Sequence, residues 1–180
     1  MAALRCALDT NFLIDLASND ASAVTIHKLL LDHRAELIVT NMARSELENL
    51  ALKKRTRREK LALTVFDKIQ DWQIGAAEIS PLHKGYIEAF RDCLIRDKVI
   101  DEREKHDGEI IGEASFARAD FLLTSDEEMI NADQSVLVYH LKNQHMWPVN
   151  VVSKKVFIRL LKSGPKSPPS LKRSGRRRPS

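Results

Sequence analysis

The chain has 180 residues, of which 43% are hydrophobic, enough for one domain with a sizeable core. No apolar run approaches the about 18 residues needed to cross a bilayer, so a membrane-spanning protein is excluded. Asp9 and Asp15 interrupt the apolar start of the chain, which excludes a secretory signal. Cys6 and Cys93 show neither metal-ligand nor redox spacing, so we expect free thiols in a reducing, cytoplasmic setting.

Positive charge is concentrated at the C-terminus. Residues 163–180 contain no acid and six basic residues, namely Lys166, Lys172, Arg173, Arg176, Arg177 and Arg178. Subtracting these six from the 29 Lys and Arg leaves 23 against 25 Asp and Glu, a net charge of −2 for residues 1–162. We expect residues 1–162 to form the globular domain and 163–180 a disordered basic tail, because Pro, Ser, Gly and Arg cannot bury enough apolar surface. The tail is either an arm for nucleic-acid phosphates or a solubilising appendage.

Apolar periodicity predicts strands that alternate with helices. In chain order these are a strand at 6–9, helices at 12–17 and 23–31, a strand at 36–40, helices at 41–52 and 57–72, a strand at 73–79 with a stop at Pro81, helices at 82–97 and 102–119, a strand at 121–124, a helix at 134–144, a strand at 149–153 and a short helix at 156–161. This alternation predicts an α/β fold with a mostly parallel sheet flanked by helices on both faces.

Two acidic residues lie where such a sheet binds ligands, at the carboxyl ends of its strands. Asp9 ends the first strand, and Asp126 follows the strand at 121–124 by two residues. A buried carboxylate is costly, so several that converge on one point indicate a cation held between them.

Two further acids are selected by the faces of the predicted helices. Glu46 lies close to the apolar stripe of its helix, whereas Glu48 is about 200° around the helix from it and should point away. Asp107 shares a face with the apolar residues three, four and seven positions further on, which predicts that it is buried. The same register predicts that Glu109 and Glu113 lie on the solvated side.

The segments around these four acids resemble the motifs of the PIN domain, a family of metal-dependent ribonucleases that includes the toxins of many toxin–antitoxin pairs. The motifs are LDTNFLID around Asp9, TNMARSELENL around Glu46, DGEIIGEA from Asp107 and LLTSDEEM around Asp126. In that order they cover about residues 4–155. One departure is Gly108 directly after Asp107, which costs a helix roughly 1 kcal/mol relative to Ala.

The resemblance implies a three-layer α/β sandwich and an endoribonuclease that hydrolyses RNA phosphodiesters. It assigns Asp9, Glu46, Asp107 and Asp126 as catalytic residues and as the ligands of Mg²⁺ or Mn²⁺. The implied partners are single-stranded or structured RNA, a second copy of the chain in a homodimer and, for a toxin, a cognate antitoxin. The sequence does not distinguish a toxin from a processing nuclease that acts alone.

Other polar residues are candidates for supporting roles. The side chains that could orient the metal ligands or their waters are Thr10, Asn11, Thr124 and Ser125, although Thr10 and Ser125 could instead cap helices. Candidates for RNA-backbone contact are Lys53, Lys54, Arg55, Arg57, Arg58, Arg176, Arg177 and Arg178. The run at 53–58 is equally typical of a solvated linker between helices. The histidines, including His106, show no ligand spacing, which favours surface or core roles.

Three alternatives fit less well. A haloacid-dehalogenase-like phosphatase needs a second Asp two residues after the first, where this chain has Asn11. A response-regulator receiver needs a phosphorylatable Asp at a middle strand end and a Lys at a late one, which the strand ends here do not offer. The third is a catalytically silent PIN-like module that binds RNA or docks a partner. The loss of an acid would favour it, but all four are present.

Overall fold

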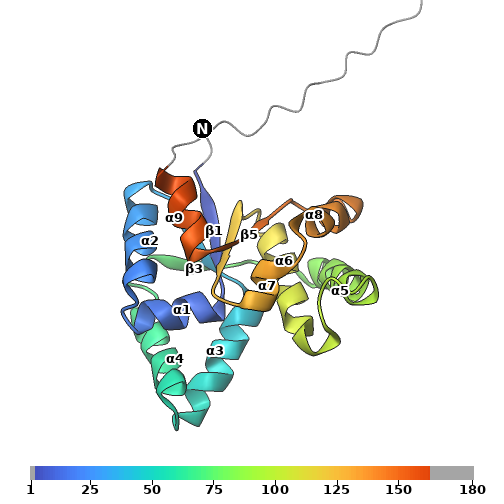
Figure 1. Ribbon diagram of the computed structural model, residues 1–180. Coiled ribbons are helices and arrows are strands. Elements are labelled where there is room, and N and C mark those ends of the chain that lie inside the picture. Colours follow the sequence, from blue (N-terminus) through green and yellow to red (C-terminus); the bar gives the residue numbers. More distant parts are fainter. Residues whose placement is uncertain (1–2, 163–180) are drawn as a thin grey trace, which may run out of the picture.

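The structure is a computed structural model that describes residues 3–162 (Figure 1). The predicted tail at 163–180, with Arg176, Arg177 and Arg178, lies outside the described residues. None of the helices within residues 3–162 combines the length and the apolar character that a bilayer span requires.

Five strands form one sheet with the order β3-β2-β1-β4-β5. The strands are β1 (Arg5–Leu8), β2 (Glu36–Val39), β3 (Ile74–Ala76), β4 (Phe121–Thr124) and β5 (Asn150–Ser153). Every neighbouring pair is parallel, which confirms the predicted α/β fold with a parallel sheet. Because the chain moves outward from β1 to β3 and then crosses to β4 and β5, right-handed crossovers place the two sets of connecting helices on opposite faces.

Helices cover both faces of this sheet, as Figure 1 shows. Their bounds are α1 (Thr10–Ala17), α2 (Ala21–Asp32), α3 (Asn41–Lys53), α4 (Arg57–Lys68), α5 (Pro81–Arg96), α6 (Lys105–Phe116), α7 (Glu127–Asn131), α8 (Gln134–Asn143) and α9 (Lys154–Lys162), with a 3₁₀ turn at Glu102–Glu104 before α6. Helices α1, α2 and α9 lie on one side, and α6, with α5 and α8 beyond it, lies on the other. Helices α3 and α4 extend past the carboxyl edge of the sheet.

The three central strands are buried on both faces. Ala7 and Leu8 of β1 and Leu122 and Leu123 of β4 are all fully buried, and Leu37 of β2 is only 2% exposed. A parallel sheet covered by helices on both sides produces such continuous apolar runs rather than alternation. The apolar runs from which these strands were predicted therefore also supply residues of the hydrophobic core.

Element boundaries differ from the prediction at several places. The strand expected at 73–79 shortens to Ile74–Ala76, and the helix expected at 57–72 ends at Lys68. Pro81, expected only as a stop, is the first residue of α5, where its missing N–H costs nothing and Ser80 caps the helix. The helix expected at 102–119 begins with the 3₁₀ turn, so α6 itself starts at Lys105.

Two glycines of α6 allow α5 to pack closely against it. A Cβ at Gly112 would lie 3.0 Å from Cγ2 of Ile87, and one at Gly108 would lie 3.1 Å from Cγ of Arg91. This close approach is the physical reason for a glycine beside Asp107, where helix propensity disfavours one. Gly85 in α5 differs, because among the described residues no atom beyond its chain neighbours and its own helical backbone lies within 4 Å of a Cβ built there.

We predict opposite stability effects at two of these helical glycines. Gly85→Ala should raise the free energy of unfolding by roughly 0.5–1 kcal/mol, since it restricts the unfolded chain without a clash. Gly112→Leu should lower it by about 1–3 kcal/mol, because the new side chain overlaps Ile87. Urea unfolding monitored by circular dichroism measures both changes. Equal effects at the two sites would contradict the α5–α6 packing described above.

Candidate functional site

Asp9 and Asp126 both follow a strand and both cap the next helix. Asp9 accepts from the backbone N–H of Thr10 (2.6 Å) and of Asn11 (3.4 Å) at the start of α1. Asp126 accepts from the N–H of Glu128 (2.9 Å) at the start of α7. Because β1 and β4 are neighbouring parallel strands, the two carboxylates reach the same edge of the sheet, as predicted.

Two buried threonines make hydrogen bonds to the acids of this region, Thr124 to Asp9 and to the backbone of Asp126, and Thr10 to Glu46. Thr124 Oγ1 donates to Asp9 Oδ2 (2.7 Å) and accepts from the backbone N–H of Asp126 (2.9 Å), so one hydroxyl joins both acids. Thr10 Oγ1 donates to Glu46 Oε2 (2.6 Å), which brings α3 against the start of α1. Thr10 does not cap a helix, which was the alternative role considered for it, because Asp9 is the cap and Thr10 is the first residue of α1.

Glu46 and Glu48 point in different directions, which confirms the predicted register of α3. Glu46 turns to Thr10, whereas Glu48 is exposed and pairs with Arg44 (3.1 Å). Glu46 Oε1 also lies 3.7 Å from Nδ1 of His106, a residue for which the sequence predicted no part in the site. Its position directly before Asp107 at the start of α6 was the signal that could have found it.

Asp107 completes the set from α6 and is only 9% exposed. Burial, together with the negative charges of Asp126, Asp9, Glu104 and Glu46, raises the pKa of Asp107 to about 8. Burial and the charge of Glu46 raise the pKa of Asp9 to about 6, despite the hydrogen bonds that Asp9 accepts. The four predicted carboxylates therefore lie within electrostatic reach of one another, at the cost of like-charge repulsion.

The chemistry of this site fits a hard divalent cation, which prefers carboxylate oxygens from several elements. The positions of the described side chains, in contrast, do not form a cation-binding arrangement. Within residues 3–162, no group of three or more His, Cys, Asp or Glu side chains is arranged so that it could hold a metal ion. What the described residues form is an acidic site, which we define as Asp9, Glu46, Asp107 and Asp126.

Ser125 does not join the acidic site. Its hydroxyl donates to Asp15 Oδ2 (2.7 Å), and Lys154 Nζ pairs with the same oxygen (2.7 Å). Lys154 also pairs with Asp20 (2.9 Å), so this cluster ties α9 to α1 and α2. The Ser125 hydroxyl therefore bonds to Asp15 and not to one of the four acids that it could have supported. It also caps no helix, because Asp126 caps α7. The remaining candidate, Asn11, places its side-chain Nδ2 3.5 Å from Asp126 Oδ2.

The prediction that Glu109 and Glu113 are solvated was wrong. Glu113 is 9% exposed, and its Oε2 accepts from the backbone N–H of Met42 (2.9 Å) in the first turn of α3. Burial raises the pKa of Glu113. Glu109 is half-buried and pairs with Arg91 of α5. The prediction assumed that α6 has one apolar, buried stripe and that its other side faces solvent. In the structure, α3 and α5 both pack against that other side.

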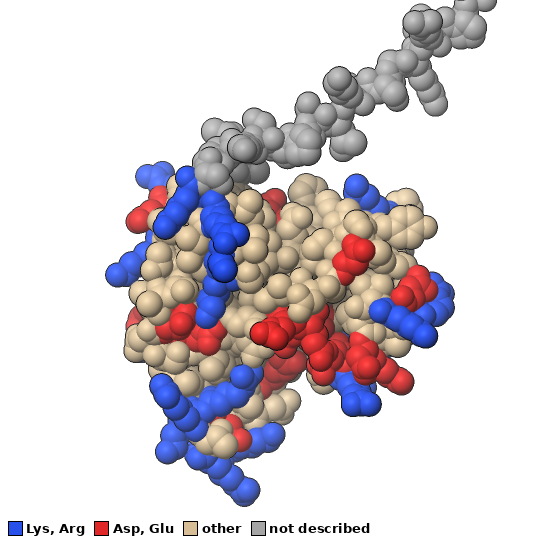
Figure 2. Space-filling model, in the orientation of Figure 1, with Lys and Arg blue, Asp and Glu red and all other residues tan. Residues whose placement is uncertain are grey.

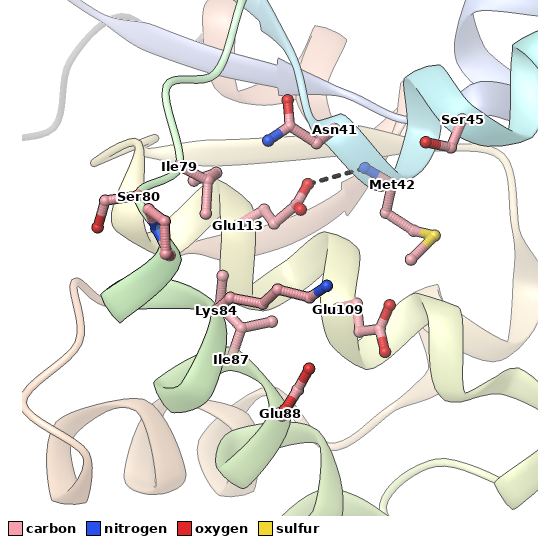
Figure 3. Close-up of a pocket in the computed structure, with 11 residues that line it drawn as sticks. Asn41, Met42, Ser45, Ile79, Ser80, Lys84, Ile87, Glu88, Glu109 and Glu113 are labelled. Carbon is pink, nitrogen blue, oxygen red and sulfur yellow. Dashed lines mark hydrogen bonds between the residues drawn. The ribbon is translucent and has the colours of Figure 1, made fainter.

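These two glutamates line a cavity of about 370 Å³ between the start of α3, α5 and α6. Figure 3 shows Lys84 from α5 and Glu109 and Glu113 from α6 pointing into it. The hydrogen bond from Met42 to Glu113 crosses between α3 and α6. It therefore ties the helix that carries Glu46 to the helix that carries Asp107.

Basic side chains gather beside the acidic site. Figure 2 shows Lys and Arg around the turn between α3 and α4, below a group of Asp and Glu side chains. We define the basic tip as the exposed residues of this turn, namely Lys53, Lys54, Arg55, Arg57 and Arg58. Lys54 adopts a left-handed conformation (φ 55°) that ends α3, and Thr56 caps α4. The linker is therefore an ordered turn.

Comparison with known proteins identifies a shared fold. No family model matches the chain, and no curated protein matches its sequence. Among solved structures, the chain is similar to VapBC2 from Rickettsia felis bound to a DNA fragment from its promoter. The TM-score is 0.59 at 14% sequence identity, and the match covers 83% of this chain and 98% of that chain. At this identity the likeness shows the fold, and it agrees with the predicted PIN-like three-layer arrangement.

We predict that Asp107→Asn makes the metal-free protein more stable at pH 8. The pKa of Asp107 in the folded state, about 8, lies above its ordinary value of 3.8, so folding favours its protonated form. The stability from this group is complete below about pH 4 and is lost as the pH rises through about 8. Asparagine does not ionise, so the variant keeps the free energy of unfolding that the wild type loses when Asp107 ionises. Each kcal/mol kept in this way should raise the melting temperature by about 2–4 °C.

Thermal melts in EDTA at pH 5 and pH 8 measure this effect. The fall in melting temperature between the two pH values should be smaller in Asp107→Asn than in the wild type. Asp67→Asn, which neutralises an exposed acid of α4, is the matched control and should retain the wild-type fall. An equal fall in all three proteins would contradict the electrostatic description of the acidic site.

Proposed function

We propose that the protein is a metal-dependent endoribonuclease of the PIN type that hydrolyses RNA phosphodiesters at the acidic site. The observation that supports this most strongly is the convergence of four carboxylates from separate elements at the carboxyl edge of the sheet. Burial, together with the repulsion from neighbouring carboxylates, raises the pKa values of Asp107 and Asp9, and a bound cation would relieve both effects. Two such carboxylates about 5 Å apart repel by roughly 3 kcal/mol at an effective dielectric constant near 20.

Hydrogen bonds support three of the four acids in this role. Asp9, Glu46, Asp107 and Asp126 would hold Mg²⁺ or Mn²⁺, which when bound polarises a phosphate and lowers the pKa of a water. The Thr124 hydroxyl links the Asp9 carboxylate to the backbone N–H of Asp126, and the Thr10 hydroxyl donates to Glu46. Hydrolysis by an activated water needs no nucleophile from the protein.

The proposed partners follow from the surroundings of the site and from the fold. The basic tip next to the acidic site suits an RNA backbone, which carries one negative charge at each phosphate. The similar solved structure contains VapBC2, and the PIN family includes the toxins of many toxin–antitoxin pairs. We therefore propose a toxin with a cognate antitoxin as its partner, in preference to a processing nuclease that acts alone.

One observation favours a second candidate function. As the side chains stand within residues 3–162, no group of three or more acidic, His or Cys residues could hold a metal ion. A catalytically silent PIN-like module would bind RNA through the basic tip without Mn²⁺ and would leave the RNA intact. Cleavage in Mn²⁺ but not in chelator separates the two functions.

Removing one acid should abolish cleavage without unfolding the protein. We predict that purified Asp9→Asn and Asp107→Asn fail to cleave labelled total RNA in Mn²⁺, while the wild type cleaves it and stops when EDTA is added. Asp67→Asn is again the control and should cleave at the wild-type rate. Circular dichroism verifies folding in each case. Cleavage by either site variant at the wild-type rate would contradict the proposed function.

Glu46 and Glu48 provide a matched pair for cation binding. Glu46→Gln should weaken Mn²⁺ binding by about tenfold or more, because it removes one charged oxygen ligand. Glu48→Gln removes the same charge from the same helix but points to Arg44, so it should leave Mn²⁺ affinity unchanged. Isothermal titration calorimetry measures both affinities. A larger loss of Mn²⁺ affinity in Glu48→Gln than in Glu46→Gln would mean that the cation binds on the side of α3 that carries Glu48, which would contradict the proposed site.

A further inference from the structure

Arg58 is the member of the basic tip that touches a residue of the acidic site's own motif. It lies in the first turn of α4, and its Nη2 donates to the side-chain Oδ1 of Asn11 in the first turn of α1. Helices α1 and α4 pack against each other, so this contact joins two adjoining elements although the residues are 47 positions apart. The guanidinium therefore has a defined place at the rim of the site.

Asn11 connects this guanidinium to two of the four acids. Its side-chain Nδ2 lies 3.5 Å from Asp126 Oδ2, and its backbone N–H points to Asp9 Oδ2 at 3.4 Å. Arg58 is thus separated from both strand-end carboxylates by one residue, Asn11, whose side-chain amide reaches Asp126 and whose backbone N–H reaches Asp9. It does not itself pair with either of them, so the positive charge is not cancelled by a direct salt bridge to these two acids.

The backbone under Arg58 is fixed by the cap of α4. Thr56 Oγ1 accepts from the N–H of Glu59 (3.2 Å), and Glu59 Oε2 accepts from the N–H of Thr56 (2.8 Å), which together form a capping box. Arg58 itself is exposed, and the guanidinium group has five N–H donors. Within residues 3–162 its hydrogen-bond partner is Asn11, so its remaining donors can meet a ligand from solvent.

An anionic substrate needs such a cation here. The acidic site repels an RNA phosphate at long range, and a fixed positive charge on its rim offsets that repulsion. The planar fork of an arginine binds two oxygens of one phosphate, which also fixes the orientation of the strand. A lysine supplies the charge without the fork.

We propose that Arg58 is a substrate-binding residue whose guanidinium, held by Asn11, binds a backbone phosphate of RNA directly beside the acidic site. This inference rests on the proposed function, because it names the residue that seats the substrate. It separates Arg58 from the rest of the basic tip, whose other members contribute only general attraction. Arg57 is the matched comparison, since it has the same charge in the same turn of α4, is exposed and points elsewhere by about 100° of helical rotation.

The test uses full-length wild type, Arg58→Gln, Arg58→Lys and Arg57→Gln. Binding of a fluorescently labelled single-stranded RNA is measured by anisotropy in EDTA at fixed salt, so that no cleavage occurs. Arg58→Gln should weaken binding by about tenfold or more, as expected for loss of a charged hydrogen-bonded contact, and should raise KM for cleavage in Mn²⁺. Arg57→Gln should lose clearly less RNA affinity than Arg58→Gln. The RNA affinity of Arg58→Lys should lie between those of these two variants.

Mn²⁺ affinity, measured by calorimetry without RNA, should be unchanged in Arg58→Gln. A fall in that affinity would overturn the inference, because Arg58 would then act by positioning the acids. Equal losses of RNA binding in Arg57→Gln and Arg58→Gln would also overturn it, since general attraction would explain both. If the wild type does not cleave RNA but Arg58→Gln alone loses RNA binding, the ribonuclease proposal fails while Arg58 stands as an RNA phosphate site.

Discussion

The hydrogen bond from the Thr124 hydroxyl to the Asp9 carboxylate joins the ends of the two central strands, and the rest of the site is arranged around it. Because β1 lies between β2 and β4, the helix after β2 reaches Asp9 from one side and the turn after β4 reaches it from the other. Thr10 then brings Glu46 to the same point. Several acids are thereby held together against their repulsion by hydrogen bonds that the fold supplies.

Packing between helices, rather than loop structure, sets the positions of the two acids that do not follow a strand. Gly108 and Gly112 let α5 press against α6, which carries Asp107. Glu113, on the same helix, accepts a hydrogen bond from the first turn of α3, which carries Glu46. Asp107 lies in the first turn of α6, where a carboxylate interacts favourably with the helix dipole. This interaction offsets part of the cost of burying Asp107. Side chains outside the acidic site therefore help to fix its geometry.

Local sequence patterns predicted the parts of this arrangement that depend on one element at a time. Apolar runs predicted the strands, strand ends selected Asp9 and Asp126, and the helical period separated Glu46 from Glu48. Features that depend on two distant elements were missed. The solvated face assigned to Glu113 is covered by α3, whose sequence lies 71 residues earlier at Met42. The partner of Ser125 lies 110 positions away, and the contact of Arg58 with Asn11 likewise depends on how α4 packs on α1.

A crystal structure of the protein grown with Mn²⁺ would show whether the acidic site binds a divalent cation. Anomalous difference density locates manganese without reference to activity or to RNA. We expect a peak between Asp9, Glu46, Asp107 and Asp126, with the four carboxylates closer together than they are without the metal. A manganese-containing crystal with no peak there, or with these four side chains coordinating nothing, would contradict it.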